Sequence, residues 1–332
     1  MDEYVISNKQ LKLRPNPKKC NSKFLFYYFS LPQMVQHIND IAIGSAVPGI
    51  NLGLLKGIKV CLPPKNQQDK IAAILSAYDD LIENNKRRIA LLEKMAGEIY
   101  REWFVRFRFP GYQTAEFEKG IPKGWGMVKL EKAFQFLGGG TPSKENEAYW
   151  KDGNINWFTP SDITGASGIF LSGSGDQPNE EGLNNCSAKL FPAYSIMMNS
   201  RATIVEIGIN RTEACTNQGL ITCIPNKQHP LHYLYFWLKL SRNYFISLCG
   251  GATFPEINKS TFKRIEILTP SESIVKKFSC VAGPVFEQIE TLLQENENLN
   301  KTKNLLLPRL ISGKLSLENL DIQFPPSMQE LG

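Results

Sequence analysis

The sequence predicts an α+β protein, in which globular segments of mixed helix and strand are joined by two long helices. Three observations carry this prediction. The chain repeats itself at a constant offset of 207 positions, both copies contain a heptad pattern, and the segment between the two patterns is rich in Gly, Pro, Asn and aromatic residues.

The repeat is clearest around two prolines. Gly44-Ser-Ala-Val-Pro48-Gly-Ile50-Asn51 lies 207 positions before Gly251-Ala-Thr-Phe-Pro255-Glu-Ile257-Asn258. Without a gap, Lys56, Ile58 and Pro63 then match Lys263, Ile265 and Pro270. A repeat of about forty residues would indicate a solenoid, whereas this one indicates two copies of a whole domain and its connecting element. Two similar modules in one chain can present two recognition surfaces.

Composition places the chain among ordinary soluble proteins. Its 332 residues suffice for roughly two to three domains, and 42% of them are hydrophobic. No apolar run reaches the roughly 18 residues that span a bilayer, and Asp2 and Glu3 argue against a signal peptide. Seven scattered cysteines without C-x-x-C spacing indicate reduced thiols in a cytoplasmic protein. A net charge of +6 permits nucleic-acid binding without proving it.

The segment from Gln67 to about Arg106 is predicted to be one long helix. Its heptad positions step by alternating threes and fours, and they are Ile71, Ile74, Tyr78, Leu81, Asn85, Arg88, Leu92, Met95 and Ile99. Because most of these are apolar or aromatic, they predict a coiled-coil seam. About 35 helical residues reach about 50 Å, which is more than one domain needs, so the helix is expected to act as a spacer.

The second copy keeps this heptad with more polar breaks. Its seam positions are Phe278, Val281, Val285, Gln288, Leu292, Glu295, Leu299, Thr302 and Leu306. Pro284 is expected to kink or restart the helix, and Asn85, Arg88, Gln288 and Glu295 are candidates for buried polar residues that fix the register. Either each helix packs on its neighbouring globular domain, or the two helices pack against each other. The second alternative explains their length and shared register better.

The segment from about Pro110 to Pro270 is predicted to mix helices and strands. Short apolar runs broken by turn formers indicate strands, and Leu231 to Ile246 is expected to be a helix. The first copy has no counterpart of residues 110–207. Its residues 1–64 contain a strand-like Tyr4–Leu13, a predicted helix from Ser22 to Ile38 and the Pro48-Gly49 turn. A fragment this small is marginal alone, so we expect the helix, a partner chain or a second copy to stabilise it.

Several motifs, each weak alone, follow one another in a specific order. In the long helices they are Gln67-Gln68-Asp-Lys-Ile71, Leu81-Ile-Glu-Asn-Asn85, Arg101-Glu-Trp-Phe104-Val-Arg-Phe107 and Leu305-Leu-Leu-Pro308-Arg309-Leu-Ile-Ser312-Gly313. In the globular segment they are Ile121-Pro-Lys-Gly-Trp125, Gly138-Gly-Gly-Thr141-Pro-Ser143, Trp157-Phe-Thr-Pro-Ser161-Asp162-Ile, Ser200-Arg201-Ala-Thr203-Ile, Thr216-Asn217-Gln218-Gly219 and Gly251-Ala-Thr253. With this layout, essentially the whole chain resembles the specificity (S) subunit of type I restriction–modification enzymes.

The resemblance implies two target-recognition domains that alternate with two conserved helices, packed as an antiparallel coiled coil. The expected segments are a remnant of the first recognition domain (1–64), the first helix (65–107), an intact second recognition domain (108–270), the second helix (271–316) and a tail (317–332). This sequence departs from the family pattern because most of the first recognition domain is absent from it. That departure puts a normal two-part DNA target in doubt.

The resemblance also implies function and partners. It implies a non-catalytic, cytoplasmic reader of double-stranded DNA that docks two methyltransferase (M) subunits and, for restriction, nuclease (R) subunits. No cofactor is expected on this chain, since S-adenosylmethionine, ATP and Mg²⁺ would belong to the partners. The positions expected to bind partner subunits or the opposite helix are Ile71, Ile74, Tyr78, Leu81, Asn85, Leu92, Tyr100, Trp103, Phe104, Val281, Val285, Leu292, Leu299 and Leu306.

DNA contact requires donors for phosphates and a few side chains for base edges. The phosphate candidates are Gly139, Gly140, Thr141, Ser143 and Lys144, unless these form a plain glycine turn. Arg201, Thr203, Asn217 and Gln218 could read guanine and adenine, although loop Asn and Gln are more often turn residues. Thr253, Lys259 and Lys263, with Lys56 as the counterpart of Lys263, are further basic candidates or a solvated edge. The matched motifs add Trp157, Ser161 and Asp162.

Enzymatic alternatives lack their motifs. The sequence has no Asp/Glu-x-Lys tripeptide, no Walker loop and no Asn/Asp-Pro-Pro-aromatic tetrapeptide. His229 and His232 lack further metal ligands at suitable spacing, so a surface pair is expected there. Two alternatives to a normal specificity subunit remain open: a half-subunit that dimerises to read a symmetric site, and a partner-binding scaffold that has lost specificity.

Overall fold

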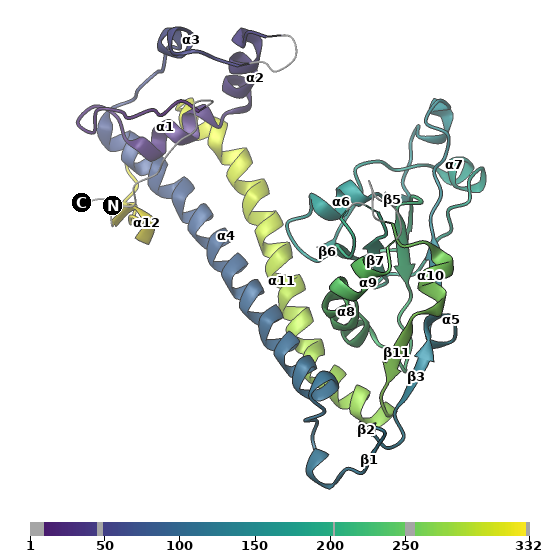
Figure 1. The fold of residues 1–332 in the computed structure, drawn as a ribbon. Coiled ribbons are helices and arrows are strands. Elements are labelled where there is room, and N and C mark those ends of the chain that lie inside the picture. The colour runs from purple at the N-terminus through teal and green to yellow at the C-terminus, as the bar shows by residue number, and fades with distance from the viewer. Residues whose placement is uncertain (1–9, 45–48, 202, 250–255, 330–332) are drawn as a thin grey trace. The chain divides into compact units, whose positions relative to one another are not determined.

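The computed structural model describes residues 10–44, 49–201, 203–249 and 256–329 (Figure 1). The chain forms two compact units. Unit 1 comprises residues 1–88 and 294–332, and unit 2 comprises residues 89–293. Two long helices, α4 (Lys65–Tyr100) and α11 (Glu272–Ile311), contribute to both units. None of the helices in the described part of the chain has the length and apolar character that crossing a membrane requires.

The regular elements in the described part of unit 1 are helices, joined by irregular loops and one β-bridge. It contains α1 (Ser22–Phe29), α2 (Pro32–Ile41), α3 (Leu52–Gly57) and α12 (Pro326–Gln329), together with one end of each long helix. Its core consists of Phe24, Tyr27, Leu31, Ile71, Ala72, Leu75, Leu307, Leu310 and Leu317. Apolar side chains from α1, both long helices and the C-terminal tail therefore share one core.

The predicted helix from Ser22 to Ile38 is two helices. The break falls at Ser30 and Leu31, because Pro32 disfavours helical backbone at the residue before it, and Leu31 accordingly has φ −60° and ψ 133°. The predicted strand from Tyr4 to Leu13 is not formed by residues 10–13, and residues 4–9 lie outside the described ranges. Pro48 of the predicted turn also lies outside them, while Gly49 forms a β-bridge with Ile43.

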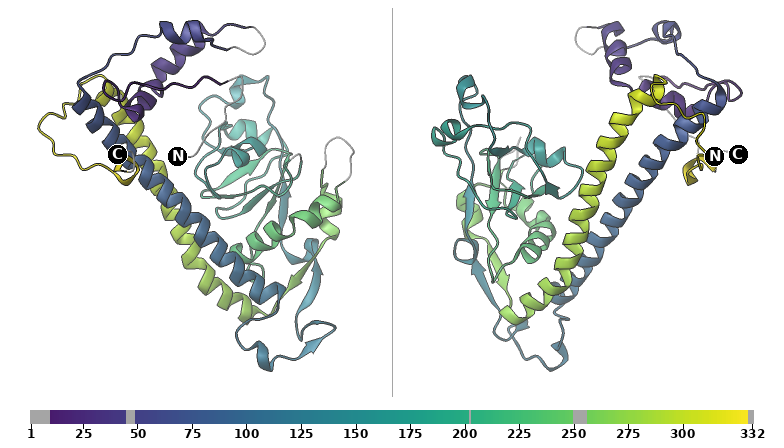
Figure 2. Two further views of the ribbon diagram at one scale, coloured as in Figure 1. Left: turned by 60° about the vertical axis from the view of Figure 1, so that its left-hand side comes forward. Right: turned by 180° about the vertical axis from the view of Figure 1, so that it is seen from behind.

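In both units α4 and α11 lie side by side (Figure 2), and their pairing is antiparallel. Lys303 bonds to Asp79 at 2.6 Å, whereas Asn296 bonds to Asn85 at 3.1 Å, so moving forward on α4 means moving back on α11. In unit 2 the rings of Tyr100 and Phe278 lie 5.9 Å apart. The structure thus confirms the predicted antiparallel pair of long helices.

The seam of this pair lies about one residue later than predicted. On α4 the buried side includes Ala72, Leu75, Ile82, Ala96 and Tyr100, whereas Leu81 and Met95 are 51% and 57% exposed. On α11, Val281 is 42% exposed while Ala282 is buried. In unit 2 the buried side of α4 also packs on helix α8 (Leu231–Leu240), since the Tyr100 ring lies 5.4 and 5.7 Å from the rings of Tyr233 and Phe236. Arg88, Gln288, Glu295 and Thr302 are exposed as well.

The remaining predicted seam residues fall into two classes. Ile71, Asn85, Phe104, Phe278 and Leu292 are buried. The half-buried ones are Ile74, Tyr78, Leu92, Ile99, Trp103, Val285, Leu299 and Leu306. Pro284 does not restart the helix, since α11 runs through it without a break. Proline has no amide proton, so the carbonyl of Cys280, four residues earlier, lacks its usual helical donor. Because Cys280 is exposed, water can donate to this carbonyl instead.

Unit 2 is built on a five-stranded sheet with the order β4-β10-β7-β8-β6. The strands are β4 (Phe136–Gly138), β10 (Leu220–Cys223), β7 (Ile196–Asn199), β8 (Ile207–Asn210) and β6 (Phe170–Leu171). All neighbours pair antiparallel except β6 and β8, which are parallel. Because β7 and β10 are buried along their whole length, this sheet is the core of the unit.

Three small sheets complete the strands of unit 2. They pair β1 (Phe117–Glu118) with β2 (Ile121–Pro122), β3 (Gly126–Lys129) with β11 (Glu266–Thr269), and β5 (Asn156–Phe158) in parallel with β9 (Ala214–Thr216). The short helices are α5 (Leu130–Ala133), α6 (Pro160–Thr164), α7 (Glu180–Asn184), α9 (Arg242–Ser247) and α10 (Lys259–Arg264). A π-helical turn, Arg101–Val105, ends α4.

Helix α8 (Leu231–Leu240) anchors the sheet to the long helices. The predicted helix Leu231–Ile246 is split at Ser241 into α8 and α9. Gly97 on α4 permits the close approach of α8, since a Cβ at this position would lie 3.2 Å from the Phe236 ring. Polar contacts add to the packing: Tyr235 and Lys239 bond to Glu93 on α4, and Arg211 bonds to Glu290 on α11 at 3.1 Å.

The internal repeat is visible in the structure. Helices α3 and α10 begin 207 positions apart, as do α4 and α11. Asn51 and Asn258 cap the first pair in the same way, each accepting a backbone hydrogen bond three residues on, at 3.0 and 2.8 Å. The two copies of the sequence therefore fold alike from this cap into the long helix.

Candidate nucleic-acid interface

The glycine loop after β4 packs against the turn between β9 and β10. The amide of Gly140 donates to the carbonyl of Thr216 at 2.9 Å, and the Thr141 hydroxyl donates to Gln218 Oε1 at 2.5 Å. A Cβ on Gly139 would lie 2.0 Å from the Thr216 carbonyl oxygen. Only glycine therefore allows the two loops to approach this closely, and their side chains emerge together.

Three further segments meet at the same turn. Ser200, after β7, donates from its amide and its hydroxyl to the Gly219 carbonyl, at 3.0 and 2.9 Å. Pro160, at the start of α6, lies against Gly219. The Lys259 side chain runs so close to Gly138 that a Cβ there would lie 1.9 Å from its Cε.

The exposed side chains around this turn form one surface, which we call the loop edge: Thr141, Ser161, Arg201, Gln218 and Lys259. They come from positions up to 118 residues apart in the chain, between Thr141 and Lys259. Sequence reasoning named all five as candidates, and the structure brings them together at one end of the central sheet.

The loop edge combines the two chemistries that DNA recognition uses. Arg201 and Gln218 carry the planar groups that form paired hydrogen bonds with guanine and adenine, while Lys259 and the hydroxyl of Ser161 suit phosphate oxygens. Thr141 fixes the orientation of the Gln218 carboxamide by donating to its oxygen. Arg201 Nε donates to Glu256 at 2.8 Å, which orients a guanidinium that is still 51% exposed.

Two of the predicted DNA contacts, Trp157 and Lys144, make contacts within the protein. Trp157 is 3% exposed, and its indole nitrogen donates to the Gly140 carbonyl at 2.9 Å, so it supports the glycine loop from within. Lys144 is paired with Asp176 at 2.6 Å and lies 3.7 Å from the centre of the Trp150 ring. Because Asp176 neutralises its charge, Lys144 is a weaker phosphate candidate than its sequence position suggests.

Asp162 and Asn217 serve the backbone. Asp162 caps α6 through Thr159 and accepts from the Gly175 amide at 2.9 Å, which occupies both carboxylate oxygens. Asn217 accepts from the Gly219 amide at 2.9 Å and so forms the turn itself. Both residues therefore stabilise the backbone that carries the loop edge.

The other candidates lie apart from these contacts or are not described. Thr203 is exposed and accepts from Asn199 at 2.7 Å, and the carbonyl of Ser143 accepts from Trp150 at 3.0 Å. Lys263 is exposed on α10, whereas Lys56 belongs to unit 1 on α3. Thr253 lies outside the described ranges. Sequence reasoning did not assign a role to Glu256 or to Ser200, which it quoted only as part of a motif, because nothing local marks a residue whose partner lies 55 or 19 positions away.

No group of three or more metal-binding side chains occurs in the described ranges. His229 and His232 are not the surface pair that the sequence predicts. His229 is 1% exposed and lies 3.0 Å from the Thr269 hydroxyl, while His232 packs on the Phe286 ring. Burial lowers the pKa of His232 to about 4, so its ring is neutral in the folded protein at pH 7.

The described chain thus combines a polar loop edge on a mixed sheet with a pair of antiparallel long helices. The family model described as "Type I restriction modification DNA specificity domain" matches residues 1–94 and 122–301. The chain belongs to this family, as a type I specificity subunit.

Individual relatives agree with this assignment. The MjaIX specificity subunit of Methanocaldococcus jannaschii is 29% identical over 311 residues, which cover 90% of this chain and 70% of that protein. The HindI specificity subunit of Haemophilus influenzae is 26% identical, covering 95% and 82%. The crystal structure of a type I S subunit from M. genitalium matches with a TM-score of 0.50 and 18% identity over 89% of this chain and 74% of that one, which supports the fold.

Proposed function

We propose that this chain is the non-catalytic subunit that reads DNA sequence for a type I restriction–modification complex. The observation that supports this most strongly is the family match across both copies of the repeat, together with a loop edge that gathers base-reading and phosphate-binding side chains. Unit 2 reads one part of the target. Arg201 contacts guanine and Gln218, oriented by Thr141, contacts adenine in the major groove, while Lys259 and Ser161 hold the phosphates.

The partners follow from the same assignment. Methyltransferase subunits dock on the long helices, and restriction subunits join the complex for cleavage. Leu91 and Met95, both exposed and one turn apart on α4, are apolar anchors of the kind that partner proteins cover. S-adenosylmethionine, ATP and Mg²⁺ bind to those partners, and the assembly works in the cytoplasm on double-stranded DNA.

The test is a map of modified bases in DNA from cells that express this chain with its cognate methyltransferase subunit. An asymmetric motif in two parts, which is absent without this chain, is the expected result. Loss of every modified motif while the proteins still co-purify would contradict sequence reading and leave a partner-binding scaffold. Methyl transfer by the purified chain alone would contradict a non-catalytic role.

A second candidate is a dimer whose two copies of unit 2 read a palindrome. One contrast between the repeats favours it. Phe26 on α1 is 62% exposed, whereas its counterpart on α8, Tyr233, is fully buried. Leu13, Leu25 and Phe29 line the same hollow of about 430 Å³ in unit 1, so an apolar face is available to a second copy. A palindromic modification motif and a dimer in sedimentation would select this candidate.

A further inference from the structure

The net charge of the chain is concentrated in one short stretch. Residues 10–68 contain eight lysines and arginines and a single acidic residue, Asp40. Residues 69–332 contain 29 basic and 29 acidic residues, so they contribute no net charge. The first nine residues add Lys9 against Asp2 and Glu3. The basic character of the protein is therefore a property of unit 1, and not of unit 2, which carries the loop edge.

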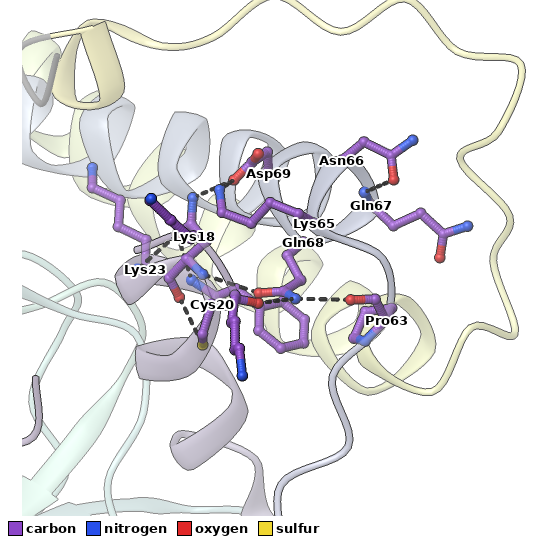
Figure 3. Close-up of polar contacts among 12 residues, drawn as sticks. Lys18, Cys20, Lys23, Pro63, Lys65, Asn66, Gln67, Gln68 and Asp69 are labelled. Atoms are coloured by element: carbon purple, nitrogen blue, oxygen red, sulfur yellow. Dashed lines mark hydrogen bonds and ion pairs between the residues drawn. The ribbon is translucent and has the colours of Figure 1, made fainter. Parts of the chain in front are cut away.

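Four of these cations gather where the loop before α1 meets the start of α4. Figure 3 shows Lys18, Lys23 and Lys65 around Gln68 and Asp69. Lys19 lies at the same place, because its carbonyl accepts from Gln68 at 3.1 Å. We call Lys18, Lys19, Lys23 and Lys65 the lysine cluster.

Little of this charge is neutralised inside the protein. Lys65 pairs with Asp69 at 2.5 Å, and the Lys23 ammonium donates to the hydroxyl of Ser327 at 2.6 Å, which is a neutral partner. Lys18 and Lys19 are exposed and form no ion pair within the described ranges. The cluster thus presents an excess of positive charge to solvent.

The loop that carries Lys18 and Lys19 is held in one conformation. The Asn16 carbonyl accepts from the amides of Lys19 and Cys20, at 3.0 and 2.9 Å, and its side chain accepts from the Lys18 amide at 3.0 Å. A loop fixed in this way loses little entropy when its side chains bind a partner.

Gln68, which is 1% exposed, ties this loop to α4. Its oxygen accepts from the Asn21 amide at 3.0 Å, and its nitrogen donates to the carbonyls of Lys19 and Pro63, at 3.1 and 2.8 Å. One buried side chain therefore holds three backbone segments beneath the lysine cluster, which fixes the positions of its charges.

We propose that the lysine cluster binds the phosphate backbone of double-stranded DNA without reading its sequence. The proposal rests on the proposed function, and it adds a second contact with the same ligand in a different unit. All four cations are lysines, which meet phosphates as point charges, and phosphate contacts position a protein on DNA without specifying sequence. Unit 1 thus supplies affinity that depends on salt, while the loop edge supplies discrimination.

The test compares two double variants. Lys18→Gln with Lys19→Gln removes two charges of the cluster. Lys276→Gln with Lys277→Gln removes the same charge from an adjacent, exposed pair on α11 and serves as the control. Binding to a duplex carrying the modified motif, and to an unrelated duplex, is measured between about 50 and 200 mM salt.

The expected result is a shallower dependence of log affinity on log salt for the Lys18/Lys19 variant. The slope should fall by about 0.9 for each phosphate that the protein no longer neutralises, on both duplexes alike. The ratio of the two affinities stays unchanged, and the Lys276/Lys277 control keeps the wild-type slope.

The proposal is overturned if the Lys18/Lys19 variant keeps the wild-type salt dependence, or if the Lys276/Lys277 control changes its salt dependence equally. It is also overturned if the ratio of the affinities for the two duplexes changes, because the lysines would then contribute to sequence recognition. A wild-type protein that binds both duplexes equally would contradict the proposed function. The salt dependence of that binding, compared between the wild type and the Lys18/Lys19 variant, would still test the lysine cluster. A wild-type protein that binds no duplex would overturn both.

Discussion

Asn85 and Asn296 form a hydrogen bond of 3.1 Å across the two long helices, with only 6% and 7% of their surfaces exposed. The same Asn85 amide also lies 3.3 Å from a Glu295 carboxylate oxygen. The two buried side chains can form their hydrogen bond in only one register and orientation of the helices. Sliding either helix would leave both side chains among apolar neighbours without a hydrogen-bond partner. The pair therefore fixes how the two helices of unit 1 align.

Replacing one partner should cost more than replacing both. Asn85→Leu leaves the Asn296 carboxamide buried without its partner, so we expect a loss of about 1–3 kcal/mol in the free energy of unfolding. The double variant with Asn296→Leu removes both polar groups and should recover most of that loss. Urea unfolding followed by far-ultraviolet circular dichroism measures both. A single variant as stable as the wild type would contradict this role.

The long helices show what a heptad pattern can and cannot predict. It predicted both helices and the polar site at Asn85 correctly, because these follow from local periodicity. It placed the seam about one residue early, since Leu81 and Met95 looked like better core residues than Ile82 and Ala96. Which side of a helix is buried also depends on the globular segment that packs on it, as when the Tyr100 ring lies 5.4 and 5.7 Å from the rings of Tyr233 and Phe236 on α8. A heptad pattern within one helix carries no information about that packing.

Gly139→Ala should disturb the loop edge directly. The added methyl group would lie 2.0 and 2.1 Å from the carbonyl oxygens of Thr216 and Asn217, which are backbone atoms and cannot rotate away. We expect a loss of about 1–3 kcal/mol in stability and a larger relative loss of affinity for the duplex with the modified motif than for an unrelated one. Gly126→Ala is the matched control, because nothing lies within 4 Å of its Cβ position. Equal behaviour of the two variants would show that the close approach is unimportant.

The site could be predicted residue by residue but not as a surface. Arg201, Gln218 and Lys259 were candidates because their side chains can bind bases or phosphates, and this property can be read from the sequence alone. The burial of Trp157 and the pairing of Lys144 with Asp176 were invisible, since each depends on segments 17 or 32 positions away that only folding brings close. Long-range partners thus decided that Trp157 is buried and that the charge of Lys144 is paired.

Arg201→Ala should reduce discrimination between DNA sequences. Removing a bidentate hydrogen bond to guanine costs about 1–3 kcal/mol for the matched duplex and little for an unrelated one. Arg242→Ala is the control, because Arg242 also pairs with a glutamate, Glu206, and its side chain is 50% exposed against 51% for Arg201. Fluorescence anisotropy with both duplexes measures the ratio. If Arg201→Ala weakened both duplexes equally, the residue would be a phosphate contact.

The stability of unit 2 should fall in mild acid because of His232. Burial lowers the pKa of His232 from its ordinary 6.5 to about 4, so below pH 6.5 the unfolded chain binds a proton that the folded chain does not. Stability is therefore complete above pH 6.5 and declines as the pH falls toward 4. Between pH 7.5 and 5 we expect His232 to account for a loss of about 2 kcal/mol. The pKa of His229 is also lowered by burial, which adds to the effect in the same direction.

His232→Leu isolates this contribution. The first copy of the repeat already carries Leu25 at the corresponding position, and His232 Nδ1 makes no hydrogen bond to any described residue, so leucine is expected to be tolerated at pH 7. Tryptophan fluorescence reports unit 2 selectively, because all five tryptophans lie between residues 89 and 293. Urea unfolding at pH 7.5 and 5 should then show a smaller acid loss in the variant than in the wild type, by about 2 kcal/mol. The same acid loss in both proteins would mean that other groups, and not this buried ring, govern the stability of unit 2 below pH 6.5.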